Sequence, residues 1–212
     1  MQFVIEVNNV SKTINQQEIL SHITLKLEEG KAYGFVGNNG SGKSMLFKTI
    51  CGFVKPSSGE VIFRGKIIGK DIDFIQNAGV LIESPGFLDE LSGYRNLLIL
   101  AQVNNLVDPS RIREILELVG LADARNKKVK TYSLGMKQRL GIAQVLLEDP
   151  NVLILDEPFN GLDKNAVAQF RDMFVKIKEQ GKTMLLASHI AGDIQLICDE
   201  VFEIDNGIIV DK

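Results

Sequence analysis

Two adjacent acids at the end of an apolar run are the residues of this sequence best suited to chemistry. The run "VLILD" at residues 152–156 ends in Asp156, and Glu157 follows it directly. A carboxylate at the end of a dry strand is costly unless a cation or a hydrogen-bond partner meets it. The pair therefore predicts a site where a positive group lies against the carboxylates.

A glycine-rich loop supplies the second half of such a site. The stretch "GNNGSGKS" at residues 37–44 fits the phosphate-binding pattern GxxxxGK[ST] in full, between a predicted strand and a predicted helix. Its glycines let backbone N–H groups and a helix N-terminus point at a phosphate. The flanking strand and helix disfavour the alternative, a glycine-rich turn that binds nothing. The predicted nucleotide-binding residues here are Gly37, Asn38, Asn39, Gly40, Ser41, Gly42, Lys43, Ser44 and Met45.

The side chains of the loop and of the acid pair suggest separate roles. Lys43 is expected to reach the β- and γ-phosphates, and Ser44 to place its hydroxyl on Mg²⁺. Ligands of open α/β folds bind beyond the carboxyl ends of the parallel strands, so Asp156 is expected to hold the same Mg²⁺. Glu157 would orient or deprotonate an attacking water. The alternative for Glu157, a surface carboxylate paired with a lysine, is disfavoured because Pro158 fixes the turn.

Four short apolar runs predict the strands that position these residues. The runs are too continuous for a half-exposed antiparallel sheet and are typical of buried parallel strands. Their residues are 32–37, 78–82, 151–155 and 183–188. Between Asp163 and Gln180 apolar residues recur at the helical period, which predicts a crossover helix. The pattern of residues 201–212 predicts a hairpin.

The remaining segments predict an antiparallel layer and a helical insertion. Strand patterns joined by turns occupy residues 3–12, 19–27 and 59–68. Between Ser84 and Pro150 helical patterns replace them, at residues 91–103, 109–119 and 133–148. We therefore expect one α/β domain over residues 1–212, with a mostly parallel sheet in its RecA-like core. The core, which includes the antiparallel layer, is expected at residues 1–83 and 151–212. The helical subdomain is expected at residues 84–150.

Composition limits the partners that we expect. The net charge is −3, the pI is near 5.5 and the basic residues are scattered, so no nucleic acid partner is expected. Cys51 and Cys198 lack CxxC spacing and are expected to be reduced thiols of the core. We expect neither a secretion signal nor a membrane span, because no run of about 18 apolar residues is uninterrupted.

A third stretch, "YSLGMKQRL" at residues 132–140, decides how these motifs are interpreted. Ser133 is expected to cap a helix, and Gly135 keeps the helix start open to an anion. Such a helix by itself needs no ligand. Together with the phosphate loop and the acid pair, in the same order over essentially the whole chain, it resembles the nucleotide-binding subunit of ATP-binding-cassette (ABC) transporters. The resemblance implies a P-loop NTPase fold, ATP and Mg²⁺ as cofactors, and ATP hydrolysis.

The resemblance also implies a second ATPase subunit in a head-to-tail dimer. Ser133 and Gly135 of one subunit would cover the ATP held by the other. Asp163 matches the loop that crosses this dimer interface. His189 matches a switch histidine that contacts the γ-phosphate and orients Glu157, whereas a lone histidine after an apolar strand is more often structural.

A separate membrane permease is the other partner that the resemblance implies. Its contact surface is expected around residues 86–100, where Phe87, Leu88 and Tyr94 either receive a partner helix or only pack within the chain. The protein is expected to be cytoplasmic and held at the inner face of the plasma membrane through this permease alone.

Several positions depart from the pattern of the family. Ile14 stands near the position of an aromatic residue that stacks on adenine, and Leu134 and Met136 replace a glycine and a glutamine of the signature. Glu83 replaces a glutamine that bridges Mg²⁺ and the membrane subunit. A carboxylate beside a polyphosphate is repelled unless Mg²⁺, water or a basic partner offsets it. We expect Glu83 to sense the nucleotide and Mg²⁺ and to relay this to the permease.

The Glu83 variant is similar to the ATPases of exporters that protect bacteria from lantibiotics and bacitracin. The leading hypothesis is therefore the ATPase subunit of a transporter, with export of a peptide antibiotic or resistance to it as the expected process. The alternatives are a P-loop kinase with a small acceptor, a mechanical ATPase acting on DNA, and a binding scaffold without catalysis. The first lacks an evident acceptor pocket, the second lacks sustained heptads and a basic track, and the third would not need the metal and water residues.

Overall fold

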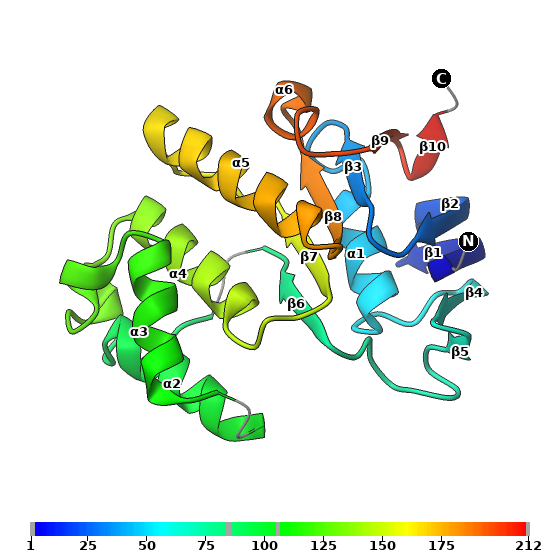
Figure 1. Cartoon of the computed structure of the whole chain (residues 1–212). Coiled ribbons are helices and arrows are strands. Elements are labelled where there is room, and N and C mark those ends of the chain that lie inside the picture. The colour runs from blue at the N-terminus through cyan, green and yellow to red at the C-terminus, as the bar shows by residue number, and fades with distance from the viewer. Residues whose placement is uncertain (1–2, 84–85, 105–106, 211–212) are drawn as a thin grey trace.

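A computed structural model describes residues 3–83, 86–104 and 107–210 of the chain (Figure 1). Its strands are β1 (Phe3–Ile14), β2 (Gln17–Glu28), β3 (Ala32–Val36), β4 (Ser58–Phe63), β5 (Lys66–Ile67), β6 (Ala78–Leu81), β7 (Val152–Asp156), β8 (Thr183–Ser188), β9 (Glu200–Asp205) and β10 (Ile208–Val210). Its helices are α1 (Lys43–Cys51), α2 (Gly93–Asn104), α3 (Pro109–Leu118), α4 (Leu134–Leu146), α5 (Lys164–Glu179) and α6 (Ala191–Ile194), with 3₁₀ turns η1 (Ala122–Ala124) and η2 (Val129–Thr131).

A six-stranded sheet of order β10-β9-β3-β8-β7-β6 forms the centre of the fold. All its neighbouring strands are parallel except the terminal β9–β10 hairpin. Successive side chains of a strand face opposite sides of the sheet. Val152 and Ile154 of β7 accordingly pack in one apolar cluster with α1, whereas Leu153 and Leu155 pack in another with α5. Burial on both faces explains the continuous apolar runs of β3, β7 and β8, and the prediction that all four strands are parallel is confirmed. The prediction of full burial is wrong for β6, where Ala78 and Val80 are only half-buried because the strand lies at the edge of the sheet.

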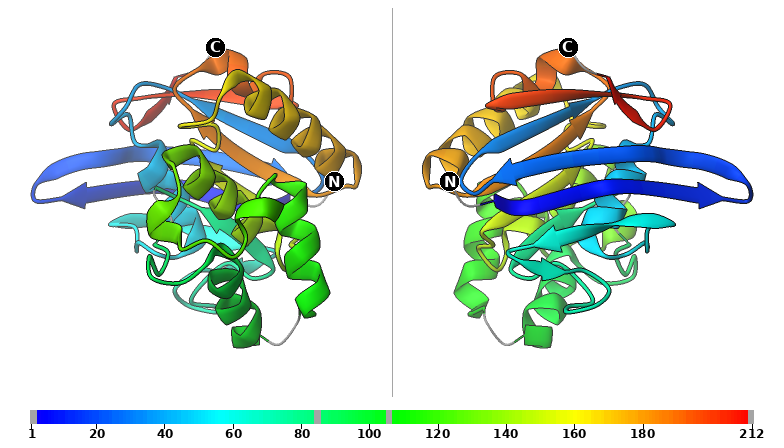
Figure 2. Two further views of the ribbon diagram at one scale, coloured as in Figure 1. Left: turned by 90° about the vertical axis from the view of Figure 1, so that its left-hand side faces the viewer. Right: turned by 90° about the vertical axis from the view of Figure 1, so that its right-hand side faces the viewer.

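A four-stranded antiparallel sheet of order β2-β1-β4-β5 covers the α1 side of the central sheet. Strands β1 and β2 form a long ribbon that projects past the rest of the molecule (Figure 2). The inward residues Val7, Leu20 and Phe63 join the same apolar cluster as Phe47 of α1. The predicted N-terminal antiparallel layer is therefore confirmed.

Helices α2, α3 and α4 are inserted between β6 and β7 and lie together on one side of the molecule (Figure 1). Asp108 caps α3 by accepting a hydrogen bond from the Ser110 N–H, and Pro109 takes the first helical position. The buried Leu97, Ile112 and Leu140, one from each helix, share a cluster with the α5 face of the sheet. The expected fold class, an α/β core with an inserted helical group, is confirmed. The subdomain boundaries near residues 84 and 150 stay predictions, and Ser84 itself lies outside the described residues.

The helix ends and the two thiols agree closely with the sequence. The three predicted helices of the insertion and the crossover helix end within two residues of the expected positions. Cys51 is buried and Cys198 is half-buried, both as free thiols, and burial raises the pKa of each to about 12. Cys51 therefore lies in the core as predicted, Cys198 packs at the edge of the core, and the reduced state of both thiols stays a prediction. Within the described residues, no helix is long and apolar enough to cross a membrane.

Replacing Gly79 with alanine is expected to destabilise the contact between β6 and α4. A Cβ at this position would overlap the carbonyl oxygen of Val145 and lie 2.9 Å from Pro150 Cγ. Overpacking of this kind costs about 1–3 kcal/mol. In a chain of this size each kcal/mol lowers the melting temperature by about 2–4 °C. Thermal unfolding followed by circular dichroism measures the effect.

The matched control is Gly192→Ala in α6, where an added Cβ would meet nothing within 4 Å. This variant is expected to melt within about 1 °C of the wild type, since surface changes usually stay within about 0.5 kcal/mol. Equal melting temperatures for Gly79→Ala and Gly192→Ala would show that β6 and α4 do not touch as described.

Candidate nucleotide site

The carboxyl ends of four neighbouring parallel strands bring the predicted site residues to one edge of the sheet. In sheet order, β3 leads into the loop at residues 37–44, β8 precedes His189, β7 ends at Asp156 with Glu157 next, and β6 leads to Glu83. Parallel strands all end at the same edge, which is where open α/β folds bind their ligands. The topology therefore explains why residues separated by more than a hundred positions meet.

A cleft of about 240 Å³ lies at this edge. Its lining consists of Ile19, Asn39, Gly40, Gly42, Lys43, Ser44, Met45, Lys48, Glu83, Asp156 and Glu157. The sequence predicted these residues except Ile19 and Lys48. The predicted adenine contact, Ile14, lies at the tip of the β1–β2 ribbon and is not among the described residues that line this cleft.

The phosphate loop holds Lys43 in place across its own backbone. Lys43 is 5% exposed, and its ammonium donates hydrogen bonds to the carbonyl oxygens of Gly37 at 2.7 Å and Asn38 at 3.0 Å. A Cβ at Gly37 would overlap the carbonyl oxygen of Ile204, which is why only glycine fits there. The buried Ser41 Oγ has no hydrogen-bond partner among the described residues. A lysine that is held by two neutral carbonyls keeps its charge available for an anion.

Ser44 and Asp156 meet at the base of the cleft. The Ser44 hydroxyl donates to Asp156 Oδ2 at 2.5 Å, while Asp156 Oδ1 is buried without a partner in the described part of the chain. Burial raises the pKa of the Asp156 carboxyl above its ordinary value; the Ser44 hydrogen bond opposes this and the charge of Glu157 adds to it. Carboxylate and hydroxyl oxygens with free lone pairs are ligands that suit Mg²⁺. These residues therefore fit the predicted metal.

Glu157 is fixed from three directions. Its Oε2 lies 2.9 Å from His189 Nδ1, and its N–H donates to the carbonyl oxygen of Ala187 at 2.9 Å. Its φ of 50° is left-handed, a conformation that costs a residue with a side chain about 1–2 kcal/mol. Gln138 of α4 holds this turn by donating to the carbonyl oxygens of Glu157 at 3.1 Å and Pro158 at 3.0 Å. Glu157 Oε1 is buried and accepts nothing from the described residues.

Glu83 has the basic partner that its position demands. Its Oε1 lies 2.5 Å from Lys48 Nζ, and both side chains line the cleft. Glu83 also has a left-handed φ, of 61°. The sequence analysis missed Lys48 and Gln138. The available signal for Lys48 was its position four residues after Ser44, which places both side chains on one face of α1.

The remaining predicted residues lie outside the cleft lining. Ser133 caps α4 by accepting a hydrogen bond from the Met136 N–H at 3.2 Å, so the predicted cap is confirmed. A Cβ at Gly135 would lie 2.7 Å from the carbonyl oxygen of Gly161, which explains the glycine. Asp163 caps α5 by accepting from the Ala166 N–H at 2.9 Å. The roles of Ser133, Gly135 and Asp163 toward a nucleotide stay predictions.

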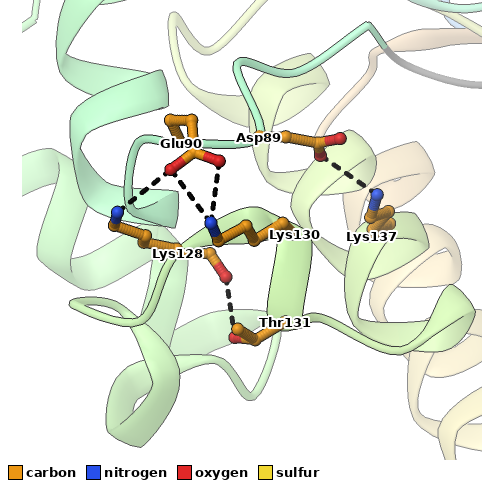
Figure 3. Close-up of polar contacts among 6 residues, drawn as sticks. All are labelled: Asp89, Glu90, Lys128, Lys130, Thr131 and Lys137. Carbon is orange, nitrogen blue, oxygen red and sulfur yellow. Dashed lines mark hydrogen bonds and ion pairs between the residues drawn. The ribbon is translucent and has the colours of Figure 1, made fainter.

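The acidic residues Asp89 and Glu90 are attached to α4 and to the segment before it by ion pairs (Figure 3). We call this group the loop clamp; its residues are Asp89, Glu90, Lys128, Lys130 and Lys137. Glu90 lies 3.0 Å from Lys128 Nζ and 2.8 Å from Lys130 Nζ. Asp89 accepts from Lys137 Nζ at 3.1 Å, and its carbonyl oxygen accepts from the Lys130 N–H at 3.0 Å. The clamp therefore connects the strand end that carries Glu83 with the helix that Ser133 caps.

The phosphate loop, its lysine and the acids at the ends of parallel strands define the class of protein as a P-loop nucleoside triphosphatase. Comparison with known proteins gives the family. A family model described as "ABC transporter" matches residues 20–160. The chain therefore belongs to the ABC transporter family, as an ATP-binding subunit, and it is an ATPase.

Relatives of known sequence agree with this assignment. The ABC transporter ATP-binding protein YhcH of Bacillus subtilis is 41% identical over all of this chain and 70% of its own length. The bacitracin transport ATP-binding protein BcrA of Enterococcus faecalis is 37% identical, with the same coverage. The lantibiotic transport ATP-binding protein SrtF of Streptococcus pyogenes is 35% identical over 99% of this chain and 90% of its own.

Solved structures share the fold. The cbiO1 protein of Clostridium perfringens, described as part of the ABC transporter complex cbiONQ, superposes with a TM-score of 0.82 at 29% identity, over 100% of this chain and 88% of that one. The ATP-binding cassette MJ0796, described as a dimer bound to ADP and Pi, has a TM-score of 0.88 over 98% of this chain and 97% of its own. At 22% identity the latter likeness concerns the fold alone.

The loop clamp is expected to weaken as the pH falls. Hydrogen bonds from Lys130 and then Lys128 lower the pKa of Glu90 from its ordinary value of 4.5. A lowered carboxyl pKa adds stability that is present above the ordinary value and is lost as the pH falls through the lowered one. Protection of the Lys130 amide hydrogen against exchange, corrected for the intrinsic rate, is therefore expected to fall as the pH drops below 4.5.

The variant Glu90→Gln is expected to lose this local protection at pH 7 and to show little further change on acidification. Glu60→Gln, an exposed glutamate of β4 outside the clamp, is the control and is expected to behave as the wild type. The amide of the buried Leu155 reports any global opening. Wild-type protection of the Lys130 amide that does not depend on pH would contradict a charge-based clamp.

Proposed function

We propose that this ATPase hydrolyses Mg²⁺-bound ATP as one subunit of a head-to-tail dimer and thereby drives a separate membrane permease. The observation that carries the proposal is the convergence of Lys43, Ser44, Asp156 and Glu157 on one cleft. Two oxygens of residues that line this cleft, Asp156 Oδ1 and Glu157 Oε1, are buried without partners in the described chain. Buried polar atoms of this kind need a ligand, a metal or water.

Catalysis in this proposal consists of positioning and electrostatic stabilisation. The Lys43 ammonium exchanges the carbonyls of Gly37 and Asn38 for phosphate oxygens. Ser44 Oγ and Asp156 hold Mg²⁺, which supplies positive charge against the phosphates when it is bound. Glu157 orients the attacking water and takes its proton at Oε1, because Oε2 already contacts His189.

The dimer accounts for the residues that lie away from the cleft. Ser133 is exposed at the N-terminus of the 13-residue helix α4, where free N–H groups suit an anion. We propose that Ser133 and Gly135 cover the nucleotide bound by a second subunit and that Asp163 lies at this interface. The exposed Leu134, 69% accessible and packed over Gly161, would form part of the same surface.

A groove of about 1000 Å³ between β6 and the helical insertion is the proposed permease site. Exposed apolar side chains of its lining include Phe53 and Val103, which are 55% and 73% accessible. Of the residues expected at this surface, Phe87 and Tyr94 pack against the core, whereas Leu88 is 55% exposed. Docking here would hold the protein, as a cytoplasmic subunit, at the inner face of the plasma membrane.

The proposed cargo is a peptide antibiotic, which the permease exports. Two observations support this class: the relatives BcrA and SrtF are named for bacitracin and lantibiotic transport, and Glu83 stands where the family has a glutamine. Resistance to such a peptide would be the cellular effect.

Glu157→Gln is expected to lower ATP hydrolysis by about 10²–10⁴-fold, because the proton acceptor is lost. Binding of Mg²⁺-bound ATP, measured by calorimetry, is expected to persist. Glu60→Gln is the control and is expected to hydrolyse ATP at the wild-type rate. Hydrolysis by Glu157→Gln at that rate would remove Glu157 from its role.

Release of labelled phosphate as free phosphate, rather than on a metabolite, excludes a kinase.

Val103→Glu is expected to reduce association with the permease about tenfold, since a charge replaces an exposed apolar contact. The measurement is co-purification with the permease, which is sought as a multi-span membrane protein among the products of the neighbouring genes. Basal ATP hydrolysis is expected to stay unchanged. Leu196→Glu, at a residue that is equally exposed outside the groove, is the matched control. Normal co-purification of Val103→Glu would place the permease on another surface.

A further inference from the structure

The cleft carries more negative than positive side chains before any nucleotide enters it. Glu83, Asp156 and Glu157 face Lys43 and Lys48 in its lining. Lys43 is directed at the loop carbonyls of Gly37 and Asn38 instead of at a carboxylate. Glu83 therefore depends on Lys48 for its charge compensation.

We propose that Lys48 is the resting counter-ion of Glu83, and that Mg²⁺-bound nucleotide displaces this pair and frees the Lys48 ammonium. This inference rests on the proposed function, since it assigns a step to the same site. Lys48 acts as a positioning residue, because it holds Glu83 in one place before the nucleotide binds.

The position of Lys48 makes such an exchange possible. Lys48 and Ser44 are four residues apart on α1, so they share the helix face that borders the cleft. Glu83 lines the same cleft as Ser44 and Asp156, the residues of the proposed metal site. A cation bound by Ser44 and Asp156 would therefore attract Glu83 and compete with Lys48 for it.

The pair is also weak enough to exchange. The side chains of Lys48 and Glu83 are 27% and 63% accessible, and ion pairs at such exposure add little to stability. Glu83 lines the cleft, and its backbone has a left-handed φ of 61°. A divalent cation can replace an ammonium here without unfolding any element.

Lys48 lines both the nucleotide cleft and the groove between β6 and the helical insertion. Release of its ammonium from Glu83 would place a positive charge at the wall that separates these two spaces. Nucleotide loading would thus change the charge of the groove where we propose that the permease docks.

The test compares four proteins: the wild type, Lys48→Gln, Glu83→Gln and the double variant. Calorimetry gives the Kd for ATP in excess EDTA and in excess Mg²⁺. We call the Kd in EDTA divided by the Kd in Mg²⁺ the magnesium factor. Lys48→Gln leaves Glu83 uncompensated against metal-free ATP, so the magnesium factor is expected to rise. In the wild-type background, Lys48→Gln is expected to raise the magnesium factor about three- to tenfold more than it does in the Glu83→Gln background.

Two further variants separate this role from a structural one. Lys48→Arg retains the charge and is expected to restore the wild-type magnesium factor. Lys26→Gln removes a lysine that pairs with Glu6 at 3.4 Å outside the cleft, and it is expected to leave the factor unchanged. Glu83→Gln alone is expected to lower the factor, so the test stands even where Lys48→Gln fails to fold.

The outcomes distinguish this inference from the proposed function. Equal effects of Lys48→Gln in both backgrounds, or an unchanged factor in Glu83→Gln, would overturn the counter-ion exchange while leaving the ATPase assignment intact. A wild-type protein that fails to bind Mg²⁺-bound ATP in the cleft would instead overturn the proposed site itself.

Discussion

The contact between Ser44 and Asp156 is the constraint on which the site depends. Asp156 is 5% exposed at the end of a strand that is buried on both faces, and its carboxylate meets a hydroxyl at the start of α1. A charge in such a place is costly without compensation. The protein therefore keeps a destabilising group at the point where its central sheet and its phosphate loop join, which is the arrangement expected of a site that awaits a cation.

The rest of the site is built around that point by the order of the strands. Parallel strands buried on both faces need continuous apolar side chains, and they leave the polar residues to the strand ends. The four neighbours β3, β8, β7 and β6 then deliver a lysine loop, a histidine, two acids and a third acid to one edge. Glu83 and Glu157 both adopt left-handed φ values, a backbone conformation that costs free energy.

The sequence was sufficient for features that depend on local pattern. The apolar runs identified β3, β6, β7 and β8, and the spacing within residues 37–44 identified the phosphate loop. It was insufficient where two distant elements meet. The pairing of Lys48 with Glu83 depends on how α1 packs on the central sheet, and the hydrogen bonds of Gln138 to the Glu157 turn depend on how α4 packs. No periodicity or motif spacing encodes such contacts, since they arise only from tertiary packing.

The hydrogen bonds of Gln138 have a consequence for communication between two copies of the chain. Gln138 donates hydrogen bonds to the turn that carries Glu157 of its own subunit, while Ser133, at the start of the same helix, is exposed. Only about 7.5 Å along the helix axis separates Ser133 from Gln138. In the proposed dimer, a shift of α4 against the phosphates bound by the other subunit would therefore move the turn that carries Glu157. ATP hydrolysis in one subunit would then depend on the nucleotide bound in the other.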